Sequence, residues 1–583
     1  MSLASRSDRL CVRFLLMCLL AVASSTIHAQ KPAVEPHGLA PLKGIVPAVD
    51  CSALLNDDLS AAIGAPTHIT EAKAVPEGKP APFCGVKGYV DPAIRFEVRL
   101  PLKNWTQRYV QTGCGGLCGN LNIELDNADD CAPATNGELV LASTDMGHGR
   151  DLSVANTNAQ IRIDFAYRAE HVTALVAKAL IQKFYGQAPK YSYFVGCSDG
   201  GREGLMEAQR YPEDFNGVVS GDAALDFITQ NTFFQQWARY LNKTASGKPI
   251  LTTDKLPILH QAALDACDGQ DGVKDGLISN PLECHFDPIV TQCKVGQDSA
   301  SCLTPDQIRI AREIFKGAHD TEGNKLTPGG PFPGSELNWA GQFVFPADTT
   351  VPPHPLADST YKYLAFQQGS GGSTIADLKF DREDFAAATK LHALYDASDS
   401  DLSAFVKRGG KLIEFHGWAD PGMSPLNTIA YYTALQKTMG KAAVDKFARL
   451  YLFPGGNHCL GGLGPFDVDL VSAMMAWVEG GHAPYALISS HRPQDDTRKA
   501  SGAATPKSAA DALVDRTRPV YPYPITAKYK GTGDSNDAKN FVAGKESVAP
   551  PALLKWLGES FYTPHEELWC TANGSSMDCA KKP

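Results

Sequence analysis

Two features are missing from this 583-residue sequence, and each absence excludes a class of partner. No cluster of lysine and arginine stands out, and the net charge of -10 is spread along the chain, so nothing suits a nucleic-acid backbone. Beyond the N-terminus, no apolar run is long enough to span a membrane. The composition, with 43% hydrophobic and 20% charged residues, is that of a globular protein. We therefore expect no nucleic-acid partner and no membrane partner.

The N-terminus has the pattern of a secretory signal. Arg6, Arg9 and Arg13 precede the apolar run 14–23, and small residues lead from it to Ala29. The alternative is a transmembrane anchor, but the run is only about half of the roughly 20 residues that a span needs. We expect cleavage after Ala29 and a secreted or periplasmic protein; the sequence leaves the choice of compartment open.

Cysteine usage agrees with export. Of 15 cysteines, Cys11 and Cys18 lie in the leader, so 13 remain. An oxidising compartment favours disulfides, and an odd number leaves at least one thiol over. Cysteines that bracket short segments are candidate pairs, namely Cys51–Cys84, Cys267–Cys284, Cys293–Cys302 and Cys570–Cys579.

The central motif is Gly-x-Ser-x-Gly. An apolar, β-prone run, 191–195, leads directly into Gly196-Cys-Ser-Asp-Gly200, and 201–211 follows with helical spacing. A serine on a sharp turn between a strand and a helix is the nucleophile elbow of α/β-hydrolases. The bare motif is common by chance, so its strand and helix carry the argument. They make Ser198 the candidate nucleophile.

The pattern around the elbow indicates an α/β protein with a mostly parallel sheet, because strands alternate with amphipathic helices. From about 225 to 395 this alternation gives way to short helical pieces, glycine, proline and scattered aromatics, which suggests an inserted lid domain. The alternative for the aromatics is that they form the insert's own core. The expected order is a signal at 1–29, an α/β-hydrolase domain in two parts at 30–224 and 396–550, a lid at 225–395 and a C-terminal tail at 551–583.

Two further motifs complete a candidate triad. Asp420 follows the predicted strand 411–415, and His458 lies in a glycine-rich loop after the strand 449–453. The order serine, aspartate, histidine is that of α/β-hydrolases. His458 would accept the proton of Ser198, and Asp420 would orient the imidazole. The rivals are Asp145, Asp401 and Asp467 for the acid and His148 and His416 for the base; we expect His416 to line the substrate pocket instead.

Cys197 precedes Ser198, and Cys459 follows His458. A catalytic serine and histidine must approach within hydrogen-bond reach, so their neighbours become plausible disulfide partners. The alternative is two unrelated buried cysteines. Elsewhere, a glycine-dense stretch at 113–119, here called the glycine loop, follows a predicted strand. It suits a second oxyanion donor, and the alternative is a flexible surface turn.

An acidic loop inside the insert has the composition of a calcium site. Asp268, Asp271 and Asp275 alternate with glycines that let the chain curl, so three carboxylates can converge on one point. The carbonyls of Val273 and Leu277 are candidates for further oxygen ligands. The spacing is not that of an EF-hand, and the alternative is a solvated acidic turn.

Together, Gly-Cys-Ser-Asp-Gly-Gly at 196–201, His-Gly-Trp-Ala-Asp-Pro at 416–421 and Pro-Gly-Gly-Asn-His-Cys at 454–459 resemble the tannase and feruloyl esterase family. That family includes mono(2-hydroxyethyl) terephthalate hydrolase, and the resemblance covers nearly all of the exported chain. It implies an α/β-hydrolase with a lid that binds an aromatic acyl group, and structural Ca²⁺ without an organic cofactor. It also implies the residues of the site, which are the triad Ser198–Asp420–His458, the bridge Cys197–Cys459, the calcium ligands Asp268, Asp271, Val273, Asp275 and Leu277, and the oxyanion N–H groups of Asp199 and of Cys114 or Gly115.

Two departures from the family pattern matter. A tryptophan-rich lid segment with an arginine, expected of terephthalate half-ester hydrolases, is not evident in 331–367. In addition, Cys114, Cys118 and Cys131 leave one sulfur over, and we expect a Cys118–Cys131 pair. The resemblance favours esters of hydroxycinnamates such as ferulate, with galloyl esters as the first alternative. Peptidase or lipase activity and a non-catalytic binding module are more distant alternatives, and the oligomeric state stays open.

Overall fold

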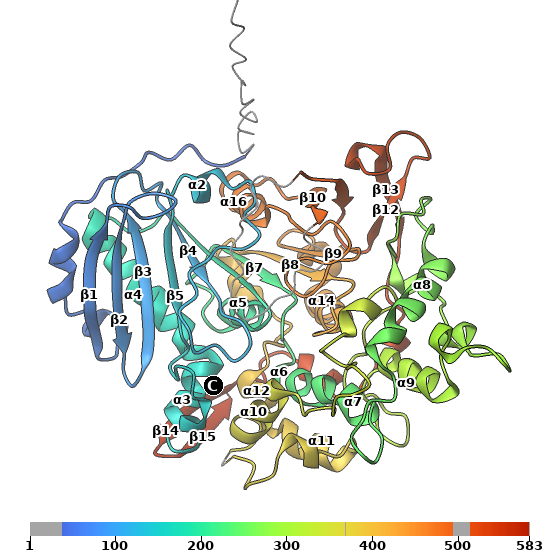
Figure 1. Ribbon diagram of the computed structural model, residues 1–583. Coiled ribbons are helices and arrows are strands. Elements are labelled where there is room, and N and C mark those ends of the chain that lie inside the picture. The colour runs from blue at the N-terminus through green and yellow to red at the C-terminus, as the bar shows by residue number, and fades with distance from the viewer. Residues whose placement is uncertain (1–37, 368, 494–512, 582–583) are drawn as a thin grey trace, which may run out of the picture. The chain divides into compact units, whose positions relative to one another are not determined.

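A computed structural model of the chain describes residues 38–367, 369–493 and 513–581. The predicted signal peptide lies outside these residues. Their centre is a nine-stranded sheet (Figure 1). Its strands lie in the order β1 (Thr67–Val75), β2 (Phe83–Val90), β3 (Ile94–Pro101), β5 (Val140–Thr144), β4 (Arg108–Thr112), β6 (Tyr191–Cys197), β7 (Gly217–Gly221), β8 (Lys411–Gly417) and β9 (Ala448–Phe453).

The sheet is antiparallel from β1 through β3 to β5 and parallel from β5 onward. Neighbouring residues of the parallel strands point to opposite faces. Val218 and Leu412 pack into a core shared with α4 (Ala169–Tyr185), α5 (Asp199–Arg210) and α14 (Pro425–Met439). Val219 and Ile413 pack into a second core with α16 (Leu470–Gly480). Apolar layers on both faces explain why these strands read as continuous apolar runs. The α/β prediction is confirmed.

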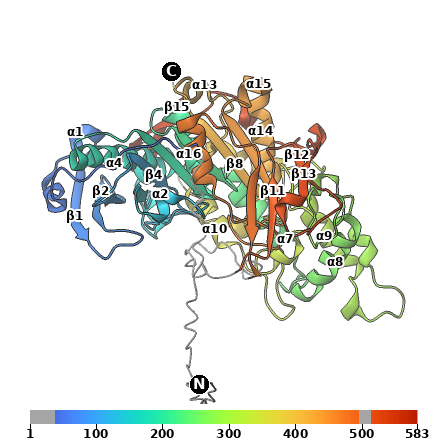
Figure 2. The ribbon, with the colours of Figure 1, turned by 90° about the horizontal axis from the view of Figure 1, so that it is seen from above.

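The segment between β7 and β8, residues 222–410, is here called the insert. Its longer helices are drawn in green and yellow and cluster beside the sheet in Figures 1 and 2. They are α7 (Gln235–Leu241), α8 (Leu256–Cys267), α9 (Pro305–Lys316), α10 (Pro355–Tyr363) and α11 (Arg382–Ala388). Phe234, Trp339 and Phe343 belong to a separate apolar cluster within the insert. For these three aromatics the core alternative is therefore correct.

The C-terminal part adds three two-stranded sheets, β10–β11, β12–β13 and β14–β15. The paired strands are β10 (Leu487–His491) and β11 (Arg516–Val520), β12 (Ile525–Tyr529) and β13 (Phe541–Glu546), and β14 (Leu568–Asn573) and β15 (Ser576–Lys581). Cys570 and Cys579 face each other across the last pair. In the described ranges, no helix is both long and apolar enough to cross a bilayer.

Six disulfides are formed within the described residues, including the five pairs expected from the sequence. These five are Cys51–Cys84, Cys197–Cys459, Cys267–Cys284, Cys293–Cys302 and Cys570–Cys579. The expected Cys118–Cys131 pair is wrong, because Cys118 is bonded to Cys114 and Cys131 is a buried free thiol. The reason is spatial: Cys131 packs into the apolar core beside α16, whereas Cys118 stays in the glycine loop.

Candidate active site

Ser198 occupies a strained turn between β6 and α5. Its backbone angles are φ 64° and ψ −121°, which non-glycine residues rarely adopt, and it is the N-cap of α5. A Cβ on Gly196 would lie 2.3 Å from the carbonyl oxygen of Gly200, so the first motif glycine cannot carry a side chain. This is the backbone geometry expected of a nucleophile elbow.

His458 is held by a buried carboxylate. Its Nδ1 lies 2.7 Å from Oδ2 of Asp420, while Oδ1 of Asp420 accepts the N–H groups of Gly422 and Met423 at 2.6 and 3.0 Å. Burial alone would raise the pKa of Asp420, but His458 and His416 hold it well below its usual range. Burial opposes the charged form of His458, yet Asp420 and Asp222 raise its pKa to about 9.

Ser198 and His458 line the same cavity, whose volume is about 1210 Å³. The residues next to them in sequence, Cys197 and Cys459, are joined by a disulfide with Cα atoms 5.8 Å apart. The rival acids lie in other interactions: Asp145 pairs with Arg95, Asp401 with His565, and Asp467 with Arg492. Of the acids proposed, Asp420 is therefore the one that the fold brings to His458.

The expectation that His416 lines the substrate pocket is wrong. His416 is fully buried and lies behind Asp420, with Nε2 3.3 Å from Oδ2 of Asp420. It is not among the residues that line the cavity. A second carboxylate that the sequence analysis missed, Asp222, lies 3.4 Å from the same nitrogen. Asp222 follows β7 directly, so the signal that singled out Asp420, a carboxylate just past a strand end, would have found it.

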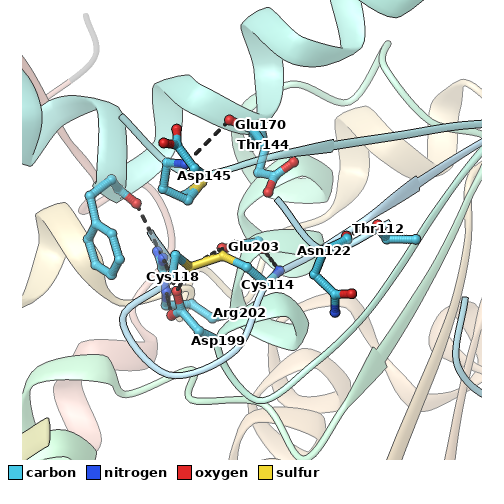
Figure 3. The surroundings of a disulfide bond; sticks show 12 residues. Thr112, Cys114, Cys118, Asn122, Thr144, Asp145, Glu170, Asp199, Arg202 and Glu203 are labelled. Atoms are coloured by element: carbon cyan, nitrogen blue, oxygen red, sulfur yellow. Dashed lines mark hydrogen bonds and ion pairs between the residues drawn. A yellow bond between two sulfur atoms is a disulfide. The ribbon is translucent and has the colours of Figure 1, made fainter. Parts of the chain in front are cut away.

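The glycine loop packs against the elbow helix (Figure 3). The backbone N–H of Cys114 donates to Oε2 of Glu203 on α5 at 3.0 Å, and Figure 3 shows the Cys114–Cys118 disulfide facing Glu203 and Asp199. The expectation that Cys114 supplies an oxyanion N–H is therefore wrong. Gly115 lines the cavity, and Asp199 is the first residue of α5, where N–H groups have no acceptor within the helix.

The part of the cavity formed by the insert carries polar side chains beside apolar ones such as Leu356. It includes the carboxamides of Asn231, Gln235 and Gln342 and the imidazole of His354. Burial and Arg239 lower the pKa of His354 to about 3, so this ring is neutral. The scattered aromatic residues of the insert are absent from the described lining of the cavity. They are Phe233, Phe234, Trp237, Trp339, Phe343, Phe345, Tyr361 and Tyr363.

The acidic loop follows α8 and is closed by the Cys267–Cys284 disulfide. Asp268 accepts the N–H groups of Asp275 and Gly276, and Asp271 accepts a hydroxyl from Ser279. Among described residues, the three carboxylates do not form a group whose ligand atoms all lie within 4.8 Å of one another. The expectation of three converging carboxylates is therefore not met in this structure.

One oxygen of Asp275 pairs with Arg518, and the other, Oδ1, is buried without a hydrogen-bond partner. Burial raises the pKa of Asp271, and Asp275 adds to the rise, so negative charge is incompletely compensated here. Oxygen donors of this type, with one left unpaired, fit a hard cation such as Ca²⁺.

Comparisons with known proteins show the family of the chain. The model of the family described as tannase and feruloyl esterase matches residues 81–543. A protein of Xanthomonas campestris pv. campestris named as an uncharacterized esterase is 32% identical over 509 residues, which cover 79% of this chain and 84% of the relative. The mono(2-hydroxyethyl) terephthalate hydrolase of Piscinibacter sakaiensis is 31% identical over 546 residues, with 82% and 86% covered. The crystal structure of feruloyl esterase B from Aspergillus oryzae superposes with a TM-score of 0.70 and 27% identity, over 82% of this chain and 97% of that one. The chain belongs to the tannase and feruloyl esterase family.

Proposed function

We propose that this chain is an exported serine esterase with an α/β-hydrolase fold and a lid. We propose that it hydrolyses esters of aromatic acids, with feruloyl esters as the leading candidate. Membership of the family makes it a carboxylic ester hydrolase. The observation that carries the proposal is that Ser198 and the Asp420-bound His458 open into one cavity and have disulfide-linked neighbours.

In the proposed reaction, Ser198 Oγ attacks the ester carbonyl while Nε2 of His458 takes its proton. His458 then gives the proton to the departing alkoxide, which leaves an acyl-enzyme on Ser198. Water, deprotonated by His458, attacks the acyl carbon; the bond to Oγ of Ser198 then breaks, His458 returns the proton to Oγ, and the acid is released. The N–H groups of Asp199 and Gly115 would stabilise the oxyanion in both steps, and Asp420 would stabilise the imidazolium.

The polar lining supports a hydroxylated aromatic acyl group. Gln342 donates a hydrogen bond to Gln235, which donates to the carbonyl of Gly422, and Oδ1 of Asn231 is buried without a partner. The hydrogen-bonding capacity that these carboxamides retain suits phenolic hydroxyl and methoxy groups. The solved relative named feruloyl esterase B favours the same acyl class. The relative named mono(2-hydroxyethyl) terephthalate hydrolase keeps a terephthalate half-ester as the second candidate. Galloyl esters are the third, because they too carry phenolic hydroxyls.

We also propose that the acidic loop holds a structural Ca²⁺ ion. Binding would draw together the carboxylates of Asp268, Asp271 and Asp275, which lie apart in this structure, with the carbonyls of Val273 and Leu277 as further ligands. The support is the all-oxygen donor set and the unpaired, buried Oδ1 of Asp275. When bound, the ion would supply charge compensation in the insert.

The deciding experiment compares rates on methyl ferulate, methyl gallate and mono(2-hydroxyethyl) terephthalate, with Ser198→Ala as the control. We expect cleavage of methyl ferulate at the highest kcat/KM and loss of at least about a thousandfold in Ser198→Ala. Substantial activity in a pure Ser198→Ala sample would refute the nucleophile. A preference for aliphatic acyl groups, peptides or long-chain lipids would refute the aromatic-ester proposal. Failure of the folded protein to cleave any ester would favour a binding module.

A further inference from the structure

A second histidine and a second carboxylate lie behind the His458–Asp420 pair. Nε2 of His416 is 3.3 Å from Oδ2 of Asp420 and 3.4 Å from Oδ1 of Asp222. Since Nδ1 of His458 is 2.7 Å from the same Oδ2 of Asp420, one carboxylate oxygen faces two imidazoles. Asp222, His416 and Asp420 have no exposed surface, so water cannot screen their charges.

The four residues come from the ends of three neighbouring parallel strands. Asp222 follows β7, His416 is in the last part of β8 with Asp420 just past its end, and His458 lies in the loop after β9. Polar groups past the carboxyl ends of adjacent parallel strands meet at one edge of the sheet. The second pair is thus built into the same edge as the proposed catalytic residues.

Asp222 also fixes the backbone of the site. Its Oδ1 accepts the N–H of Gly417 at 2.9 Å, and its Oδ2 accepts the N–H of Cys459 at 3.1 Å. Cys459 follows His458, so Asp222 anchors the loop that carries the proposed base. The φ of Asp222 is 38°, a strained value for a non-glycine residue, and such strain concentrates at functional sites.

The charges favour a protonated His416. Burial and the nearby His458 disfavour the charged form, but Asp222 and Asp420 more than offset both and raise the pKa of His416. Burial raises the pKa of Asp222 to about 6; His416 opposes this rise, and Asp420 adds to it. Glu414, on the same face of β8, has its pKa raised by burial to about 8 and is uncharged at neutral pH. On the other side, Nδ1 of His416 lies 2.8 Å from Oγ1 of Thr428.

We propose that Asp222 and His416 are positioning residues that set how tightly His458 holds its proton, with His416 as the cation that neutralises one of the two buried carboxylates. This inference rests on the proposed esterase function. With His416 charged, Asp222 and Asp420 together present one net negative charge to His458 and not two. The imidazolium that forms in each proton transfer is then stabilised by one net negative charge, and His458 holds its proton less tightly than it would beside two uncompensated carboxylates.

The test is the pH dependence of kcat/KM on methyl ferulate for the wild type, His416→Gln, Asp222→Asn and the double variant. The acid limb is the range in which kcat/KM rises with pH as His458 loses its proton. Removing the cation leaves two carboxylates facing His458, so the midpoint of this limb should move to higher pH in His416→Gln by about one unit or more. Removing a carboxylate should move the limb of Asp222→Asn to lower pH. The double variant should lie near the wild type. His171→Gln, which breaks the separate His171–Asp214 pair, is the matched control and should not move the limb.

The outcomes separate the two proposals. If the wild type shows no hydrolysis that depends on Ser198, both the esterase function and this inference are overturned. Hydrolysis with an unmoved limb in His416→Gln, or limbs that move in the same direction in both single variants, would overturn the inference alone. Melting temperatures identify a variant that fails to fold. If His416→Gln fails to fold, His416→Asn replaces it. If Asp222→Asn fails to fold, the shift measured for the histidine variant alone decides the inference.

Discussion

The buried carboxylate of Glu203 accepts the backbone N–H of Cys114 at 3.0 Å and thereby ties the elbow helix α5 to the glycine loop. Burial, together with the nearby Glu170 and Asp199, raises the pKa of Glu203 well above its usual range. A Cβ on Gly113 would lie 2.5 Å from Cα of Gly200, so the two segments are also in close backbone contact. The nucleophile and the N–H of Gly115 are consequently positioned by one rigid unit.

We predict that Glu203→Leu lowers kcat about 10- to 100-fold with little change in KM, because the glycine loop loses its anchor and a buried N–H loses its acceptor, which costs about 1–3 kcal/mol. Glu203→Gln keeps an acceptor oxygen at similar size and should retain most of the activity. Steady-state kinetics of both variants test this. Equal activity of Glu203→Leu and the wild type would contradict it.

We predict that the Cys197–Cys459 disulfide contributes more to stability and to activity than a disulfide between residues close in sequence. It closes a loop of 262 residues, for which chain entropy gives about 5 kcal/mol, against less than about 3 kcal/mol for the separation of 9 between Cys570 and Cys579. We expect Cys197→Ala/Cys459→Ala to lower both the melting temperature and kcat. The matched control, Cys570→Ala/Cys579→Ala, should lower the melting temperature only slightly and leave kcat unchanged. A similar loss of kcat in both would argue against a role in the site.

The pH dependence follows from His458. A general base must be neutral to accept the serine proton, and Asp420 and Asp222 raise the pKa of His458 to about 9. Activity should therefore be low below neutral pH and rise as pH increases through an acid limb whose midpoint is well above the usual value for histidine. A profile of kcat/KM on methyl ferulate measures it. A midpoint at or below pH 6.5 would contradict the assignment.

Removal of calcium should reduce stability more than chemistry. If Ca²⁺ binds the acidic loop, a concentration of 100 times its Kd stabilises the fold by about 2.7 kcal/mol. We expect a chelator to lower the melting temperature and Ca²⁺ to restore it. Asp275→Asn should abolish this response, whereas Asp254→Asn, an exposed acidic residue elsewhere in the insert, should preserve it. A loss of kcat at an unchanged melting temperature would contradict a structural role.

The local patterns were sufficient for several features. Continuous apolar runs predicted the parallel strands, since these strands are buried on both faces. The Gly-x-Ser-x-Gly motif predicted the strained backbone of Ser198, since a turn of that tightness needs glycines beside it. The Cys197–Cys459 disulfide spans 262 positions and was predicted through the chemistry, because a serine and a histidine that exchange a proton must bring their neighbours close.

Contacts between distant segments were decided only by the tertiary structure. The sequence offered three cysteines, and packing placed Cys131 in an apolar core while Cys118 met Cys114. From the sequence, His416 was expected to line the pocket because it lies near the end of a strand. In the structure its side chain lies behind Asp420 and close to Asp222, which is 194 positions away in the chain. Sequence determined which groups stand at each strand end; the order and pleat of the strands determined which of them meet, because that depends on the packing of the whole sheet.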